Sequence, residues 1–261
     1  MLRVTVPEAL AAAAQVGITR VVTVGCDEPS SKWSVTCAAQ HPAVYAAVAI
    51  HPNEVPAPAP APAPASVSNA QTIPLERAES AIDVIEQLAR QPRVVAVGET
   101  GLDYYWDSRP HDLQQWWFRQ HIAIAKRTGK ALMIHDRDAH ADVLRILAEE
   151  GPPDRVIFHC FSGDAEMAKV CAEAGYVMSF AGVVTFANAK PLREAALVAP
   201  PELILAETDA PYLTPMPNRG KPNSPAMTAY TIRFLAELKG IDLAEFCDII
   251  TANAQRVFGW D

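Results

Sequence analysis

The sequence predicts an α/β fold, a TIM-type (β/α)8 barrel whose first strand is absent or incomplete. Short apolar, β-branched runs recur along the chain with helical segments between them, which is typical of a parallel sheet covered by helices. The chain has 261 residues, half of them apolar, which suits one barrel domain. Seven such runs are found, whereas closure of the common barrel takes eight strands.

The amino-terminal part of the chain supplies two predicted strands. An alanine-rich helix over Glu8–Val16 has high helix propensity and ends at Gly17. A strand is then predicted at Val21–Gly25, followed by a loop at Asp27–Ser31. After the loop, a helix that ends at Gln40 and a second strand at Val44–Ile50 are predicted.

The missing strand would have to precede the first helix, where only Met1–Val6 is available. Leu2–Val6 alternates apolar and polar residues, which allows a stunted strand, but a loop is the favoured interpretation. A barrel with such a gap leaves two unpaired sheet edges, which proteins usually cover by association or with another segment. Self-association through the open barrel edge is therefore a predicted consequence.

A Pro/Ala-rich tract at 56–65 interrupts the pattern. Regular alternation of proline and alanine is incompatible with the interior of a helix or a sheet, so the tract is predicted to be an exposed, polyproline-like loop insertion. Residues 1–261 are otherwise predicted to form a single domain. From Leu75, the spacing of Ala78, Ile82 and Ile85 predicts an amphipathic helix.

The stretch Val94–Tyr105 carries the strongest local signal. Val94–Val97 is an apolar run typical of a strand buried on both faces, and it is predicted to break at Gly98 and to end in Glu99. A buried carboxylate is costly unless something neutralises it, so a bound cation is one interpretation. The alternative is a carboxylate that caps the next helix.

The rest of the chain continues the same alternation. A helix is predicted from about Leu113 to Thr128, and its aromatic residues Trp116, Trp117 and Phe118 are assigned to the core in preference to base stacking. The remaining strands are predicted at Ala131–Ile134, Val156–Phe158, Tyr176–Phe180 and Leu203–Ala206, and two terminal helices at Ala226–Leu238 and Leu243–Val257.

The composition limits the function classes. Five scattered cysteines without a C-x-x-C pair argue against a thiolate zinc site and favour a reducing, cytoplasmic location. No apolar run is long enough to cross a membrane, and no secretory signal is evident. The net charge of −8 disfavours non-specific binding to nucleic acid, so bound cations would have to supply positive charge for a polyanionic substrate.

Polar residues follow five of the predicted strands at their carboxyl ends, and they are His51, Glu99, His135, His159 and Asp209. In a parallel barrel these ends converge on one face, where the active sites of this fold lie. Mixed imidazole and carboxylate ligation suits a borderline divalent ion. His135 and His159 are predicted to hold one ion with Glu99, which is also the candidate to bridge a second ion. Asp209 is predicted to ligate and to act as the general base.

Five motifs contain these residues, and a sixth motif follows them. They are AIHP at 49–52, GETGLDY at 98–104, IHDRDA at 134–139, HCFSG at 159–163, ETDAPYL at 207–213 and NRGKPNSP at 218–225. In this order they resemble the TatD family of metal-dependent deoxyribonucleases, within the amidohydrolase-like superfamily. The resemblance implies hydrolysis of phosphodiester bonds in DNA by metal-activated water, with two divalent cations that are Mg, Mn or Zn.

The same resemblance assigns roles to individual residues. Glu99, His135, His159 and Asp209 fall on the metal-ligand positions of the family, and Glu99 and Asp209 are the predicted catalytic residues. His51 and Arg219 fall on positions expected near the substrate phosphate. The family also begins with a strand that carries a His-x-His pair, and this chain has no histidine before His41.

Two explanations of that departure stay open. Either the true start lies upstream of Met1, or this variant has lost one metal and most of its activity. The competing functions are accordingly a catalytically impaired metal-binding protein that acts through association, and a barrel hydrolase of another small ester or amide.

Several residues near the predicted site have two interpretations. Asp103 and Asp136 are candidates to orient the ligand histidines, as metal sites commonly need. Arg137 and Lys221 could contact phosphate or pair with acidic residues. Trp106 and the pair Tyr104–Tyr105 could stack exposed bases, although packing over the barrel rim is favoured. Cys160 is interpreted as a small apolar residue in preference to a ligand.

Overall fold

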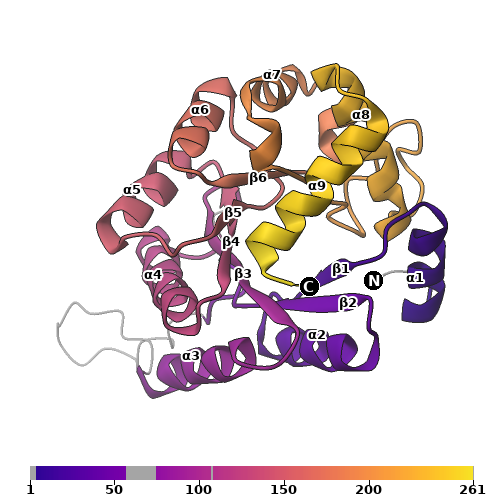
Figure 1. Cartoon of the computed structure of the whole chain (residues 1–261). Coiled ribbons are helices and arrows are strands. Elements are labelled where there is room, and N and C mark those ends of the chain that lie inside the picture. The colour runs from indigo at the N-terminus through magenta and orange to yellow at the C-terminus, as the bar shows by residue number, and fades with distance from the viewer. Residues whose placement is uncertain (1–3, 57–74, 107, 261) are drawn as a thin grey trace.

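The computed structural model describes residues 4–56, 75–106 and 108–260, and within them it confirms the predicted parallel barrel architecture. A seven-stranded parallel sheet has the order β1 to β7, so each strand lies beside its neighbours in sequence. The sheet curls around a central axis with helices on its outer face (Figure 1). The strands are β1 (Val21–Val24), β2 (Val44–Val48), β3 (Val94–Asp103), β4 (Ala131–Arg137), β5 (Val156–Phe158), β6 (Val177–Phe180) and β7 (Ile204–Ala206).

Nine α-helices accompany the sheet in the described residues. They are α1 (Val6–Gln15), α2 (Glu28–Gln40), α3 (Leu75–Ala89), α4 (His111–Thr128), α5 (His140–Glu150), α6 (Ala165–Glu173), α7 (Lys190–Val198), α8 (Thr228–Lys239) and α9 (Leu243–Phe258). Three short 3-10 helices, η1 (Gly182–Thr185), η2 (Pro201–Leu203) and η3 (Pro225–Met227), complete the description. None of these described helices is long and apolar enough to cross a membrane.

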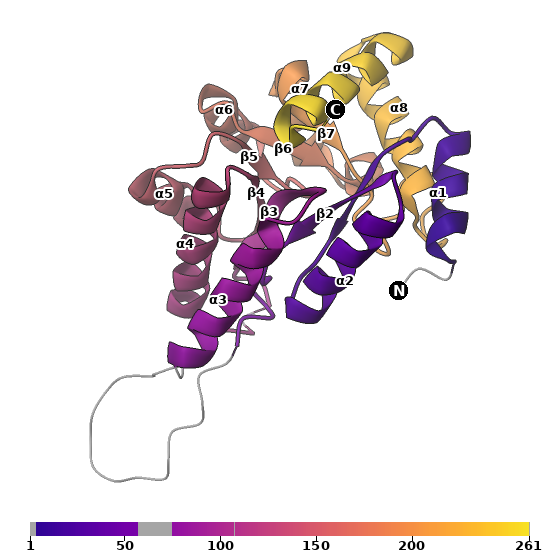
Figure 2. The same ribbon diagram turned by 60° about the horizontal axis from the view of Figure 1, so that its bottom comes forward.

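As predicted, the described residues contain no strand ahead of the first helix. Val4 and Thr5 lie outside any strand, and Val6 already belongs to α1, which Thr5 and Glu8 cap reciprocally. β1 and β7 are therefore the two ends of the described sheet. α1 packs against η3, so segments from the two ends of the chain lie side by side (Figure 2).

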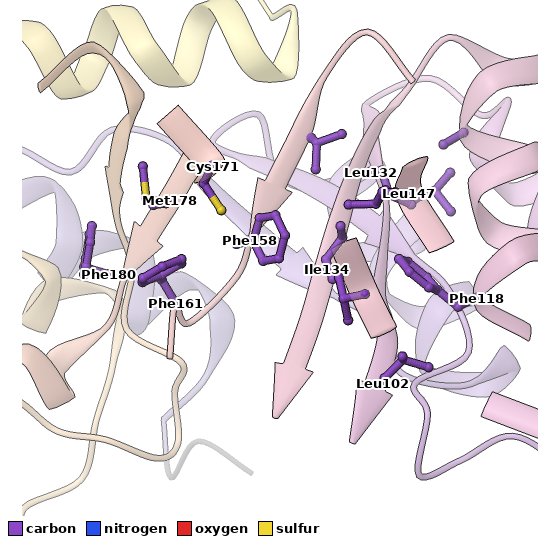
Figure 3. Packing of buried hydrophobic residues seen from close by; sticks show 14 of the residues in the cluster. Leu102, Phe118, Leu132, Ile134, Leu147, Phe158, Phe161, Cys171, Met178 and Phe180 are labelled. Atoms are coloured by element: carbon purple, nitrogen blue, oxygen red, sulfur yellow. The ribbon is translucent and has the colours of Figure 1, made fainter. Parts of the chain in front are cut away.

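The hydrophobic core has an outer and an inner part. Between the sheet and the helices, Phe118, Ile134, Phe158 and Phe180 are fully buried (Figure 3). The inner part is lined by apolar strand residues, together with Val257 from α9, and comprises Ala47, Ala96, Ala131, Met133, Ile157, Val177 and Leu205. Ala131 and Val177 are the first residues of their strands, so α9 covers the amino-terminal end of the barrel (Figure 1). The carboxyl end is left for the site.

The aromatic residues of α4 belong to the core, as predicted. Trp117 and Phe118 are buried, and Trp116 packs against the same cluster with partial exposure. His121 is also fully buried, and its Nε2 accepts the Ile50 N–H at 3.1 Å. The helix thereby fixes the segment that follows β2.

Several predicted boundaries are wrong by a few residues. β2 ends at Val48, before Ile50, and α4 begins at His111, ahead of Leu113. α2 begins at Glu28, inside the predicted loop, because the Asp27 carboxylate accepts the Ser30 N–H at 2.8 Å and caps the helix. The Pro/Ala-rich tract at 56–65 lies outside the described residues except for Pro56.

The largest correction concerns β3, which continues past Gly98 to Asp103. Its pairing with β4 is interrupted between Val97 and Thr100 and then resumes, with Gly101 opposite His135. β4 likewise continues through His135 to Arg137. Glu99 therefore projects from an irregularity within a strand. The prediction that β3 ends at Glu99 is wrong.

Candidate metal centre

The irregularity in β3 places Glu99 at the carboxyl end of the barrel. Gly98 lies so close to β4 that a Cβ atom there would be 2.5 Å from the Met133 carbonyl oxygen. At Gly101 a Cβ would be 2.0 Å from the His135 carbonyl oxygen, and the φ of +142° also favours glycine. These two close approaches hold Glu99 and His135 on adjacent strands.

Three imidazole nitrogens converge on one oxygen of Glu99. The Glu99 Oε1 atom lies 2.6 Å from His135 Nδ1, 3.4 Å from His159 Nε2 and 3.5 Å from His51 Nε2. His159 Nε2 also lies 3.7 Å from Asp209 Oδ1. All five predicted strand-end residues therefore gather in one place, although they come from five segments of the chain.

Burial makes this cluster of charges strongly interacting. Burial raises the pKa of Glu99, but the positive charges and hydrogen bonds of His159, His135 and His51 outweigh it and hold the pKa well below its usual value. The carboxylate is thus negative and surrounded by nitrogen atoms. A metal cation can bind to such a cluster in place of the protons on the imidazole nitrogens.

His135 is held from behind by Asp103. Its Nε2 donates to Asp103 Oδ2 at 3.1 Å, which leaves Nδ1 facing Glu99. Burial lowers the pKa of His135, but the Asp103 and Glu99 carboxylates raise it to about 9. For Asp103 itself burial raises the pKa, and the hydrogen bonds from His135, the Trp106 N–H and Asn53 lower it to about 2. Asp103 thus orients His135, the role expected for it.

His159 has an equivalent support from Glu207. The Nδ1 atom lies 2.9 Å from Glu207 Oε1, so Nε2 faces Glu99 and Asp209. Glu207 also accepts hydrogen bonds from Ser179 Oγ at 2.5 Å and from the Cys160 N–H at 3.1 Å. A carboxylate behind a histidine fixes the ring and raises its basicity, which is the usual outer support of a metal-binding histidine.

Asp209 lies where a proton acceptor would act. Burial, followed by the charges of Glu207 and Glu99, raises its pKa to about 6, against the opposing effect of His159. Its backbone has a φ of +51°, in the left-handed region that aspartate enters more readily than most residues with a side chain. The carboxylate is ionised at neutral pH and can still take up a proton.

His51 presents a different hydrogen-bonding pattern. Its Nδ1 accepts the N–H of Asn53 at 3.1 Å, so in the neutral ring the proton is on Nε2, which faces Glu99. A group of His51, Glu99 and His135 has ligand atoms within 4.8 Å of one another and is itself geometrically able to hold an ion. With Nδ1 occupied by the Asn53 N–H, the Nε2–H of the neutral ring is a hydrogen-bond donor, and the phosphate-binding role of His51 stays a prediction.

The predicted ligands of one divalent cation lie around the same carboxylate oxygen. His135 Nδ1, His159 Nε2 and Glu99 would supply two nitrogen atoms and a carboxylate, a mixture that suits a borderline divalent ion. The group whose ligand atoms all lie within 4.8 Å of one another has His51 in the place of His159. For a second ion the described residues offer Glu99 and Asp209 together with His51, and no His-x-His pair. Which of these residues bind metal remains a prediction of the donor geometry.

Other predicted contacts fall outside the cluster. The Arg219 guanidinium lies 4.4 Å from the centre of the Phe186 ring, and Lys221 Nζ donates to Asn218 Oδ1 at 3.0 Å. Asp136 lies 2.8 Å from His140 Nδ1, so the structure gives it a different histidine partner from the one expected. The phosphate-binding role of Arg219 stays a prediction.

Glu207 is the site residue that sequence reasoning missed. It stands directly after β7, in the same position relative to its strand as the other candidates, and the strand-end rule would have found it. Cys160, interpreted from the sequence as a small apolar residue, lies in a turn after β5 with a φ of +42°. Burial and the Glu207 charge raise the pKa of its thiol well above the usual value, which favours the neutral form.

Comparison with known proteins supports this picture. The family model described as TatD related DNase matches residues 3–259. The metal-dependent hydrolase TatD of Mycobacterium tuberculosis is 47% identical over 261 residues, covering 98% of this chain and 91% of that protein. YabD, a metal-dependent hydrolase of Bacillus subtilis, is 38% identical over 243 residues and covers 92% and 88%.

A solved structure shows the same fold. The crystal structure of YJJV, a TatD homologue from Escherichia coli K12, has a TM-score of 0.84 and 25% identity, and the match covers 98% of this chain and 92% of that one. On the evidence of the family model, the relatives and this fold, the chain belongs to the TatD family of metal-dependent hydrolases.

Proposed function

We propose that this protein is a deoxyribonuclease that cleaves phosphodiester bonds in DNA with the help of divalent cations. The supporting observation is the convergence of three imidazole nitrogens on Glu99 Oε1, with the second nitrogens of His135 and His159 bound by carboxylates. The description of the matching family as TatD related DNase supports the choice of substrate. The free thiols of the described cysteines support a reducing compartment such as the cytoplasm.

The residues divide the work as follows. Glu99, His135 and His159 would hold a cation that polarises a phosphoryl oxygen and lowers the pKa of a water molecule. Asp209 Oδ1 accepts the proton of the attacking water, because its pKa of about 6 leaves it ionised at neutral pH and close enough to that pH to act as a base. His51 Nε2 donates a hydrogen bond to the phosphate, and Arg219 contributes a further positive charge.

The test is cleavage of end-labelled single-stranded DNA by the purified chain with Mn²⁺ or Mg²⁺. We expect cleavage that EDTA abolishes, and a loss of roughly 100-fold or more in Asp209→Asn, the range typical of a missing general base. Glu166→Gln, on the exposed start of α6, is the control and should keep the parent rate. Equal rates in the parent and Asp209→Asn would reject the assignment.

One observation favours a second candidate, an impaired metal-binding protein that acts through association. The described residues contain one group of three side chains able to hold an ion, His51, Glu99 and His135, and no His-x-His pair for another ion. Elemental analysis that finds no more than one ion per chain, together with no cleavage of DNA, would favour this candidate. Turnover of a small ester or amide without cleavage of DNA would instead favour a hydrolase with a different substrate.

A further inference from the structure

Two aromatic side chains stand exposed directly after β3, next to the metal centre. Tyr105 is 55% exposed and Trp106 is 61% exposed, whereas Tyr104 stacks on His111 with ring centres 3.6 Å apart. Tyr104 therefore packs against a neighbouring ring, whereas more than half of the surface of Tyr105 and of Trp106 is exposed. The Tyr105 and Trp106 rings meet edge to face, with centres 5.1 Å apart and planes at 89°.

A guanidinium group completes this surface. Arg137, the last residue of β4, places its Cζ atom 3.8 Å from the centre of the Tyr105 ring and 5.5 Å from that of Trp106. A guanidinium over an aromatic face is an attractive contact that keeps both planes ordered. We call these three residues the Tyr105–Trp106–Arg137 platform.

The platform is tied to the metal centre through one buried carboxylate. Asp103, which is 1% exposed, accepts the backbone N–H groups of Tyr105 and Trp106 on Oδ1, each at 3.1 Å. Its other oxygen, Oδ2, accepts the hydrogen bond from His135 Nε2. Arg137 follows His135 by two residues on β4. The position of the platform relative to His135 is thus set by short covalent and hydrogen-bonded links.

We infer that the Tyr105–Trp106–Arg137 platform stacks a base of a single-stranded DNA substrate whose phosphodiester bond lies at the metal centre. This inference rests on the proposed function and assigns to these three residues the binding of an unpaired base beside the bond that is cleaved. Exposed aromatic rings and arginine bind bases of any sequence by stacking, and positive charge beside them binds the phosphate backbone. In a duplex the bases already stack on one another, so only a single strand or a frayed end offers a free face.

The charge of the molecule supports a local contact of this kind. With a net charge of −8 the chain lacks the overall basic character with which proteins bind duplex DNA through many phosphates. Stacking depends less on such charge. A few bases stacked at the platform would then bind the DNA strand, and the metal centre would act on the adjacent phosphodiester bond.

The experiment measures binding in the absence of cleavage. All proteins carry Asp209→Asn and are titrated with a fluorescently labelled thymidine decamer in Mg²⁺, and in parallel with a decamer of the same phosphate backbone without bases. We expect Trp106→Ala to raise the Kd for the thymidine decamer by roughly 5- to 100-fold, the range for loss of one base–aromatic stack. The Kd for the abasic decamer should not change.

The matched control is Trp33→Ala on α2, because Trp33 is also 55% exposed but lies on a different element. It should bind both decamers like the parent, and Trp106→Phe should restore most of the affinity for the thymidine decamer. The inference is overturned if Trp106→Ala binds the thymidine decamer like the parent, or if the parent shows no preference for thymidine over the abasic decamer. Binding that follows the expected pattern without DNA cleavage in the parent chain would reject the proposed nuclease and leave the platform standing.

Discussion

At the scale of single residues, the centre is built so that protons and a cation compete for the same atoms. Glu99 faces three imidazoles, and His135 lies between two carboxylates that raise its pKa to about 9. At neutral pH both nitrogens of His135 therefore carry protons, and the proton on Nδ1 must leave before that atom can bind a metal. The same carboxylates that orient the ring thus set the pH dependence of metal binding.

The first prediction is that metal affinity rises with pH. Because one proton must leave His135 when the metal binds, the affinity for Mn²⁺ should rise about tenfold per pH unit between about pH 7 and pH 9. Calorimetric titrations in buffers of different ionisation enthalpy would count the protons released. In Asp103→Asn the affinity should fall about 10- to 100-fold and the pH dependence should weaken, because the ring loses its orienting carboxylate. An affinity independent of pH would contradict the assignment of His135 as a ligand.

The second prediction concerns His121, a buried histidine outside the centre. Its Nδ1 donates to the Trp117 carbonyl at 2.7 Å, its Nε2 accepts the Ile50 N–H, and burial lowers its pKa to about 4. Because the unfolded chain takes up this proton near pH 6.5 and the folded chain does not, the stability contributed by neutral His121 is present above that pH and is lost as the pH falls toward 4.

Chemical denaturation at several pH values would measure this effect. Relative to His121→Gln, the free energy of unfolding of the parent should fall by about 3 kcal/mol between those two pH values. The comparison with the variant removes the contributions of the other titrating groups. Parallel pH curves for the two proteins would show that His121 is protonated in the folded state.

At the scale of elements, the pair β3 and β4 carries the centre. The strands make two stretches of parallel pairing with an irregularity between them, and Glu99 projects from the irregularity while His135 lies in the second stretch. Irregularities of this kind re-aim a side chain next to an active site. The close contact at Gly101 is what allows the second stretch to form.

The third prediction tests that contact. In Gly101→Ala the new Cβ would meet the His135 carbonyl at 2.0 Å and would also strain a φ of +142°. We expect a loss of about 2–4 kcal/mol in the free energy of unfolding and weaker metal binding, because β3 and β4 must separate. Gly17→Ala is the matched control, since Gly17 also has a positive φ of +85° but no atom within 4 Å of the new Cβ. It should cost only about 1 kcal/mol. Equal losses in the two variants would show that the contact is unimportant.

At the scale of the whole molecule, the described sheet is a curled row of seven strands with its two ends at β1 and β7 (Figure 2). α9 covers the amino-terminal end of the barrel, and the centre lies at the other end. On β1, the Val21 and Gly25 N–H groups bond to the segment of β2, so by strand alternation the Val22 N–H points toward the open edge.

The fourth prediction is that this edge mediates self-association. Light scattering coupled to gel filtration should give a mass above that of one 28.2 kDa chain at micromolar concentration. Val22→Pro should shift the equilibrium toward the monomer by removing the N–H at the open edge, and Val22→Ala should control for the lost side chain. A single 28.2 kDa species at every concentration would contradict the prediction.

The sequence by itself determined the parallel α/β architecture and the group of residues at the centre. Apolar runs separated by helical segments dictate parallel strands, and parallel strands bring their carboxyl ends together. Residues as distant as His51 and Asp209 could therefore be grouped without coordinates. The lack of a strand ahead of α1 in the described residues also agrees with the expectation from the sequence.

Only the tertiary structure decided how those residues face one another. The continuation of β3 beyond Gly98 depends on pairing with β4, which no local pattern encodes, so Glu99 was assigned to a strand end. The support of His159 by Glu207 likewise depends on two segments that are distant in sequence. The exposure of Trp106 depends on how the other described segments pack around it. Local periodicity fixes which elements form, whereas side-chain distances and burial are set by packing between them.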